Sequence, residues 1–286
     1  MRPSYGCVVL TQGRRLEDLD RALSSLLRQR GVDLDVVVVG NGWKPEGIRH
    51  DVRAVAVPEN LGVPGGRNAG VPHVRGELLL FLDDDAGLPD EDALERIARL
   101  FADDPALAVV QPRVVDPAGR PGPREWVPRL RVGDRTRSSE VTIVHEAIVV
   151  FRRRFFDAAG GWPDFFFFFN EGVDLTWRLL DAGHRAWYAG DIVALHPVPR
   201  RRRGRFDYFH ARNRVWLARR NLPLPLAAAH AAIWLARYAT RAGSLEDARQ
   251  ILRGYRAGLT TPPPDRRPLR WRTIWKMTTL GRPPVV

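Results

Sequence analysis

Short, almost uninterrupted apolar runs, separated by amphipathic segments, restrict most strongly how this chain can fold. A strand that is apolar at every position must be covered on both faces, as in parallel sheets flanked by helices. The intervening segments 16–29 and 90–104 place their apolar residues at helical spacing. The runs that predict strands are residues 7–11, 34–40, 52–58, 77–83, 107–112, 141–153, 185–190 and 191–199. The sequence therefore predicts an α/β fold with a parallel sheet covered by helices.

The C-terminal part of the chain differs in both pattern and charge. From about residue 206 the pattern is helical, and residues 200–286 carry 20 Lys and Arg against 4 Asp and Glu. We expect a first domain over residues 1–220 and a basic helical extension over residues 221–286.

The basic extension suggests several partners. Arginines interleaved with aromatic residues at 199–220, followed by an apolar stretch at 222–243, indicate peripheral contact with an anionic membrane surface. The alternatives are a solvated arginine face on a helical cap, a nucleic-acid-binding surface, and a loop that closes over a bound diphosphate.

Cysteine content and hydropathy indicate the compartment. The single cysteine, Cys7, excludes an internal disulfide framework and fits a reducing environment. The first apolar run is too short for a signal peptide, and no stretch reaches the ~18 uninterrupted apolar residues of a membrane span. We therefore predict a cytoplasmic protein, held peripherally at the inner face of the membrane by its basic part.

Polar side chains follow the predicted strands at the points where the strands end. Thr11 and Asn41 follow two of them, and Asp83, Asp84 and Asp85 end a third. Ligands of open α/β sheets bind beyond the carboxyl ends of the strands. Three adjacent carboxylates repel one another, so a divalent cation, for which oxygen ligands are suited, would stabilise them. The alternative is a solvated loop whose acids cap the next helix.

A glycine-rich stretch, Gly62 to Gly70, predicts a loop that carries Arg67 and Asn68 among small residues. It matches neither a P-loop nor a dinucleotide fingerprint. Its glycines, Gly66 among them, would allow the backbone to approach a ligand closely, with Arg67 available to pair with phosphate. The alternative is an ordinary turn with an arginine at a helix start.

Five segments in order and at the expected spacing resemble the rhamnosyltransferase-like branch of family 2 glycosyltransferases. They are NLGVPGGRNAG, GELLLFLDDDAGLP, FFFFFNEGVDLTWRLLDAGHRAWY, LHPV and YFHARNRVWLARRNLP, within residues 5 to about 222. The resemblance implies a GT-A fold, a Rossmann-like mixed and mostly parallel sheet flanked by helices, with residues 1–220 as the nucleotide-sugar-binding and catalytic domain.

The resemblance also assigns roles. Asp83 and Asp85 match the family's Asp-x-Asp motif, which implies that Asp85 binds Mn²⁺ or Mg²⁺ while Asp83 helps hold the ribose and the diphosphate. His196 matches a histidine that completes the metal site. The remaining donor-binding candidates are Thr11, Asn41, Gly66, Arg67, Asn68 and Asp84.

Glu171 and Asp174 match the acidic motif where the family keeps its general base. A carboxylate within hydrogen-bond reach can take the proton of an acceptor hydroxyl, and residues three apart on a helix share a face. We expect Glu171 to be the base and Asp174 its helper. The alternative is that Glu171 favours the helix N-terminus and Asp174 pairs with Arg178 at i+4.

Other candidates have equally plain alternatives. A lone histidine such as His196 is commonly a core residue bonded to a backbone carbonyl. Trp162 and Phe169 could contact an acceptor or form a lid, or could simply pack in the core. Arg203 is the lid candidate in the basic segment.

Three positions depart from the family pattern. Gly40 stands where an aspartate usually precedes the asparagine, and Gln12 replaces a usual tyrosine. Gly172 stands where many relatives carry aspartate. Gly40 removes a likely contact to the nucleobase. Gly172 weakens the assignment of the catalytic general base to the acidic motif.

These inferences lead to an inverting, metal-dependent hexosyl- or deoxyhexosyltransferase. It would move a sugar from a nucleoside-diphosphate sugar to an acceptor hydroxyl, on a lipid-linked saccharide of polysaccharide biosynthesis or another cell-envelope or secondary-metabolite acceptor. The alternatives are a nucleotidyltransferase, which would need a basic loop that TQGRRLEDL matches poorly, and a nucleic-acid-binding protein, which the acidic N-terminal sheet disfavours. Sugar, base, acceptor and oligomeric state are not encoded in these motifs.

Overall fold

The computed structural model describes residues 2–198 and 205–285, and within them a mixed sheet forms the centre of the molecule. The sheet has eight strands in the order β3-β2-β1-β4-β7-β5-β8-β6. They are β1 (Ser4–Thr11), β2 (Asp33–Asn41), β3 (Arg53–Val57), β4 (Leu78–Asp83), β5 (Leu107–Val115), β6 (Ser139–Val141), β7 (Ile148–Arg152) and β8 (Arg185–Leu195). The predicted α/β class is confirmed.

The strand directions bring the carboxyl ends of several strands to one edge of the sheet. β1 pairs in parallel with β2 and β4, and β7 lies antiparallel between β4 and β5. β5 in turn pairs in parallel with β8. Consequently β1, β2, β4, β5 and β8 all run in the same direction, and their carboxyl ends meet at one edge.

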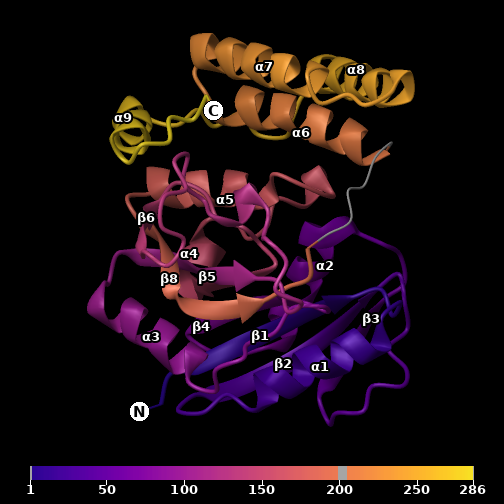
Figure 1. The fold of residues 1–286 in the computed structure, drawn as a ribbon, viewed down its shortest axis with the longest axis vertical. Helices are drawn as coiled ribbons and strands as arrows, with labels where there is room; N and C mark the ends of the chain where they lie inside the picture. Colours follow the sequence, from indigo (N-terminus) through magenta and orange to yellow (C-terminus); the bar gives the residue numbers. More distant parts are fainter. Residues whose placement is uncertain (1, 199–204, 286) are drawn as a thin grey trace.

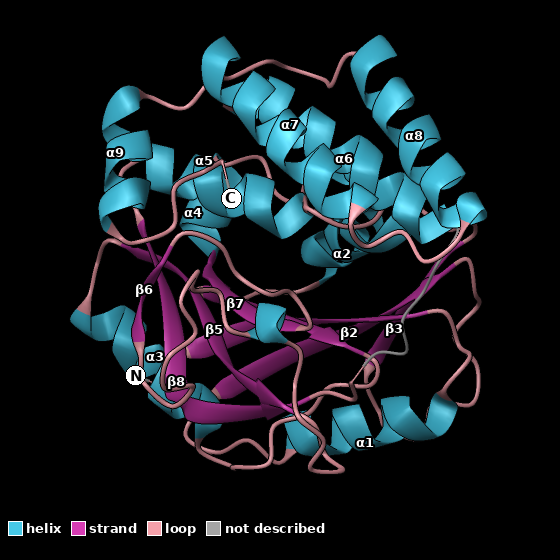
Figure 2. Ribbon diagram, turned by 45° about the horizontal axis from the view of Figure 1, so that its top comes forward, coloured by secondary structure: helices cyan, strands magenta, loops and turns pink. Residues whose placement is uncertain are grey.

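Helices cover both faces of the sheet and build a further layer above it (Figures 1 and 2). They are α1 (Leu16–Leu27), α2 (Gly62–Gly70), α3 (Ala93–Asp103), α4 (Arg153–Ala158), α5 (Glu171–Asp181), α6 (Arg205–Asn221), α7 (Leu224–Ala239), α8 (Leu245–Thr260) and α9 (Trp271–Thr279). Helices α1 and α3 cover one face, α2, α4 and α5 cover the other, and α6 to α9 lie over the second group.

Alternation along the strands explains why both faces are apolar. On β1, Cys7 and Val9 pack in a core cluster with α1 and α3. Val8 and Leu10 point to the other face and pack with residues of α4 and α5. The uninterrupted apolar runs of the sequence therefore serve two cores at once.

The helical layer begins before the expected boundary at residues 220/221. Residues of α6, α7 and α8 share one apolar cluster, while the C-terminal end of α6 and helix α9 pack against the outer side of α5. Helix α6 thus belongs with the C-terminal helices and joins them to the sheet domain.

Three segments differ from their predicted structure. Residues 62–70 form helix α2 rather than a loop, because the glycines leave room for it to lie close against the sheet. The predicted strand 141–153 is divided into β6 and β7, and residues 142–147 between them form no strand. The predicted strands 185–190 and 191–199 are one strand, β8, with a register shift opposite Pro112 and Arg113.

Candidate active site

Three aspartates end β4 and enter the turn beyond the sheet. The apolar residues of β4 are buried in the two cores, so acids can be accommodated only from the last strand residue onward. Asp83 is the last strand residue, and its Oδ1 accepts a hydrogen bond of 2.8 Å from Arg67 Nη2. Asp84 accepts one of 2.7 Å from the Thr11 hydroxyl. The expected meeting of strand ends is therefore present.

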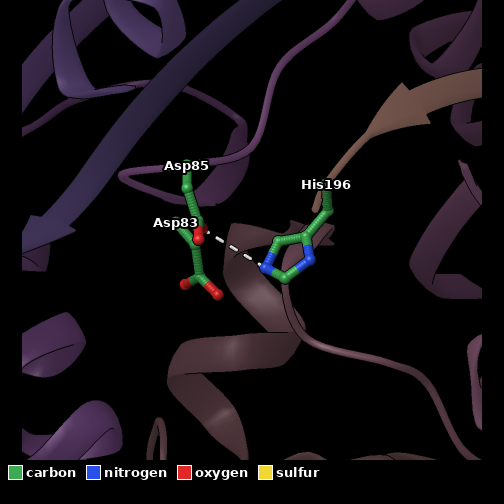
Figure 3. Close-up of side chains that lie close together, drawn as sticks. All are labelled: Asp83, Asp85 and His196. Carbon is green, nitrogen blue, oxygen red and sulfur yellow. Dashed lines mark ion pairs between the residues drawn. The ribbon is translucent and has the colours of Figure 1, made fainter. Parts of the chain in front are cut away.

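Asp83, Asp85 and His196 form the candidate metal centre (Figure 3). One possible ligand atom from each lies within 4.8 Å of the other two. His196 follows β8 directly, and its Nε2 lies 3.3 Å from Asp85 Oδ1. Two carboxylates and an imidazole suit Mn²⁺, and the carboxylates also suit Mg²⁺, so the donor set fits the expected ion.

Charge at this centre is balanced partly by Arg15. Its guanidinium pairs with Asp84 at 2.5 Å and also with Asp85. Burial raises the pKa of Asp84 to about 6, against the hydrogen bond from Thr11 and the Arg15 charge. Burial also acts to raise the pKa of Asp85, but His196 and Arg15 outweigh it and lower that pKa. Asp85 is thus kept ionised, as a metal ligand must be.

The pKa of His196 is shifted in the opposite direction to that of Asp85. Burial acts to lower its pKa, but the hydrogen bond and charge of Asp85 outweigh this and raise it. Nδ1 of the ring is buried without a hydrogen-bond partner among the described residues. This histidine therefore pairs with the carboxylate of Asp85 through Nε2, a contact that the alternative interpretation as a core histidine does not include.

Arg67 of α2 holds Asp83 from within the protein. The arginine is 1% exposed, and the Nη2 that bonds to Asp83 also donates to the Glu146 carbonyl oxygen at 2.7 Å. Its guanidinium lies 5.0 Å from the ring centre of Trp162. Glycines make this approach of α2 possible: a Cβ on Gly66 would lie 2.6 Å from a methyl carbon of Leu10. Arg67 is placed to orient Asp83 rather than to reach into solvent.

Asn41, Asn68 and Trp162 have structural partners. Asn41 accepts a hydrogen bond from the Leu61 amide and donates to the Gly62 carbonyl oxygen, at 2.9 and 2.8 Å, and so fixes the start of α2. Asn68 bonds to both the carbonyl and the amide of Trp162, at 2.7 and 3.0 Å. Trp162 is 1% exposed and packs in the core, so the structure does not place it in contact with an acceptor.

The two acids of α5 have different surroundings. Glu171 is 2% exposed, and its Oε2 is buried without a hydrogen-bond partner among the described residues. Burial, and next the charge of nearby Glu146, raises the pKa of Glu171 well above its usual range. The sequence interpretation missed Glu146, because it placed residues 142–147 within a strand.

Asp174 lies in a buried ion-pair network. It is fully buried, and its Oδ2 accepts a hydrogen bond of 2.8 Å from Arg178 Nε. Its Oδ1 accepts one of 2.6 Å from Asn221 and lies 3.1 Å from Arg220 Nε. Both oxygens of Asp174 therefore have partners in the protein, and the pairing with Arg178 is the one that the i+4 alternative predicts.

A strained loop leads into α5. Phe167, Phe169 and Asn170 have φ of 65°, 71° and 71°, a region that side chains other than glycine rarely adopt. Asn213 of α6, itself fully buried, donates from Nδ2 to the carbonyl oxygens of Phe166, Phe168 and Phe169 at 3.0, 2.6 and 2.9 Å.

The two lid candidates are Phe169 and Arg203. Phe169 is half-buried, and its ring stacks on His210 of α6 at 3.6 Å. Arg203 lies outside the described residues.

Comparison with known proteins identifies a family for this chain. The family model described as glycosyl transferase family 2 matches residues 7–160. Two proteins named pre-mycofactocin glycosyltransferase, from Mycobacterium tuberculosis strains CDC 1551 and H37Rv, are 29% identical over 202 residues. Those alignments cover 66% of this chain and 42% of the relatives, so the chain spans less than half their length.

Solved structures show the same fold. A mannosyltransferase from Pyrobaculum calidifontis, in complex with GDP-Man and Mn²⁺, superposes with a TM-score of 0.58 at 22% identity, over 98% of this chain and 85% of that one. TarS 1–349 from S. aureus, in complex with UDP-GlcNAc, gives a TM-score of 0.64 at 16% identity, over 88% and 79%. With the match of the family model over residues 7–160, these findings show that the chain belongs to glycosyl transferase family 2.

Proposed function

We propose that this chain is a metal-dependent, inverting glycosyltransferase that uses a nucleoside-diphosphate sugar. The observation that carries the proposal is the convergence of Asp83, Asp85 and His196 from β4 and β8 at the edge where the parallel strands end. A divalent ion held there supplies charge stabilisation to the departing diphosphate. Mn²⁺ and Mg²⁺ are both compatible with these ligands.

The donor has its place at the same edge. Arg67 orients Asp83, while Thr11 and Arg15 hold Asp84 beside it. Two solved structures of similar fold carry GDP-Man and UDP-GlcNAc, and we propose a donor of the same class, a hexose or deoxyhexose on a nucleoside diphosphate. In an inverting reaction, the acceptor oxygen attacks the anomeric carbon as the bond to the diphosphate breaks, and a carboxylate receives the acceptor proton.

We further propose a lipid-linked saccharide as the acceptor, with peripheral membrane contact through α9, at the cytoplasmic face. Trp271 and Trp275 are 63% and 70% exposed and lie four residues apart, hence on one side of the helix. Exposed tryptophans beside arginines are typical of proteins that lie on an anionic membrane. None of the described helices is both long enough and apolar enough to cross a bilayer.

The membrane contact can be tested by sedimentation with vesicles of phosphatidylcholine containing phosphatidylserine. Replacing both Trp271 and Trp275 by Ala should reduce binding at least tenfold, because their buried apolar area is lost. Equal binding by the double variant would contradict the contact. An acceptor like the pre-mycofactocin that the name of the curated relatives gives is then favoured.

The donor site is tested by a thermal-shift screen of UDP-, GDP- and dTDP-sugars, each with Mn²⁺, Mg²⁺ or EDTA. A ligand of the folded state raises Tm by mass action. We expect one nucleotide class to raise Tm, and expect EDTA or Asp85→Asn to abolish the rise.

Asp103→Asn, an exposed substitution on α3, is the matched control and should behave like the wild type. A rise that persists in both EDTA and Asp85→Asn would contradict the metal assignment. No rise with any donor would contradict the proposed function.

A further inference from the structure

A carboxylate from another segment occupies the space beside Gly172 at the start of α5. Glu146 Oε1 accepts a hydrogen bond of 2.6 Å from the Gly172 amide. A Cβ on Gly172 would lie 2.6 Å from Glu146 Cδ, closer than atoms can approach. Glycine at position 172 therefore makes room for Glu146, which brings its carboxylate in from the segment between β6 and β7.

Glu146 lies beside the candidate metal centre. The same Arg67 Nη2 bonds to Asp83 Oδ1 and to the Glu146 carbonyl oxygen, at 2.8 and 2.7 Å. The next residue, Ala147, accepts a hydrogen bond of 3.0 Å from the Asp83 amide. These three bonds fix the main chain of Glu146 against the strand end that carries Asp83.

Of the three acids Glu146, Glu171 and Asp174, Glu146 has the largest exposed fraction. It is half-buried, whereas Glu171 is 2% exposed and Asp174 fully buried. Both oxygens of Asp174 are also already paired with Arg178 and Asn221. The other oxygen of Glu146, Oε2, accepts no hydrogen bond from the described residues. One oxygen thus anchors the carboxylate, and the other is available.

We propose that Glu146 is the general base of this enzyme, a role that rests on the proposed function above. Glu146 Oε2 takes the proton of the acceptor hydroxyl while the acceptor oxygen bonds to the anomeric carbon. The bond from that carbon to the β-phosphate oxygen breaks, and the nucleoside diphosphate leaves with the electron pair. Burial, against the Arg67 charge, raises the pKa of Glu146 to about 7, which suits a base working near neutral pH.

The test measures nucleoside-diphosphate release from the donor found in the thermal-shift screen, with water or azide as acceptor. Water must lose a proton to become the nucleophile, and azide has none to lose. Glu146→Gln keeps an oxygen that can accept the Gly172 amide proton but cannot act as a base. Release to water should fall by about 10²–10⁴-fold. Donor affinity and release to azide should stay within about twofold of the wild type, because neither depends on removing a proton from the acceptor.

A relocation variant gives an independent readout. Glu146→Ala combined with Gly172→Asp brings a carboxylate to the same space from α5, where an acid near the helix N-terminus is tolerated. This double variant should recover at least tenfold of the release to water lost by Glu146→Ala alone. Asp157→Asn, exposed on α4, is the control.

The outcomes separate the two claims. If the wild type binds none of the donors, or binds one without releasing its diphosphate to either acceptor, the proposed function fails and this inference fails with it. If the wild type is active and Glu146→Gln releases to water at the wild-type rate, only the inference fails. Equal losses with water and azide would show a structural role and would also overturn it.

Discussion

The assignment of Asp174 to the fold rather than to the chemistry makes a quantitative prediction. Asp174→Asn removes the negative charge that Arg178 and Arg220 share. The side chains of these arginines are only 13% and 6% exposed, so both would be left as buried charges without this partner. Removing one partner of a buried pair costs about 3–5 kcal/mol. Both arginines also donate to backbone carbonyls, Arg178 to Gly161 and Arg220 to Asp265. These bonds remain, so we expect the lower limit, about 3 kcal/mol.

The assay is urea unfolding followed by tryptophan fluorescence at pH 7.5. With an m value of about 3 kcal/mol/M, the midpoint should fall by about 1 M. Asp157→Asn, exposed on α4, is the control and should leave the midpoint unchanged.

Diphosphate release by Asp174→Asn, measured where the variant is still folded, should stay within about tenfold of the wild type. An unchanged midpoint together with a loss of release of about 10²-fold or more, the size of a lost general base, would refute the structural assignment. Asp174 would then be a catalytic residue.

Three further predictions follow from the site and its surroundings. Arg15→Ala should tighten Mn²⁺ binding, measured by calorimetry, by about twofold to fivefold, because an exposed arginine no longer pairs with Asp85. Unchanged affinity would show that Arg15 does not compete with the ion for this carboxylate. Folded Glu171 keeps a proton that the unfolded chain releases above about pH 4.3, because burial raises its pKa. Stability should therefore fall as pH rises from there towards the folded pKa, and Glu171→Gln should flatten this slope in urea unfolding at several pH values; an unaltered slope would contradict the shift. Gly66→Ala should lower the free energy of unfolding by about 1–3 kcal/mol, since its methyl group meets Leu10; a Tm equal to the wild type would contradict the close packing of α2.

The sequence predicts the sheet because its signal is local. Runs such as residues 36–39 are apolar at every position, and a strand covered on both faces satisfies them. The acids at 83–85 are conspicuous because they interrupt such a run. The meeting of Asp83, Asp85 and His196 was expected only through the family resemblance, since His196 is more than a hundred residues away along the chain.

The errors have a common physical cause. The glycines of residues 62–70 predict a loop, since glycine is unfavourable in a helix. Contacts of α2 with Leu10 and other core residues override that preference. Glu146 was missed because apolar residues surround it, and nothing local shows that the strand is interrupted there. Its proximity to Gly172 depends on tertiary packing, which no short sequence pattern records.

The hydrogen bonds from Asn213 to the loop before α5 affect how the protein can fold and how it can be cut into fragments. The loop that sets the start of α5 is held in its unfavourable conformation by Asn213, a residue of α6 that leaves the ribosome later. A fragment ending at residue 198 would contain the whole sheet and the candidate metal ligands, yet its loop would lose these bonds and relax. We therefore expect the loop before α5 to reach this conformation only after α6 has packed against it, and we expect a sheet domain moved between relatives to need its own α6.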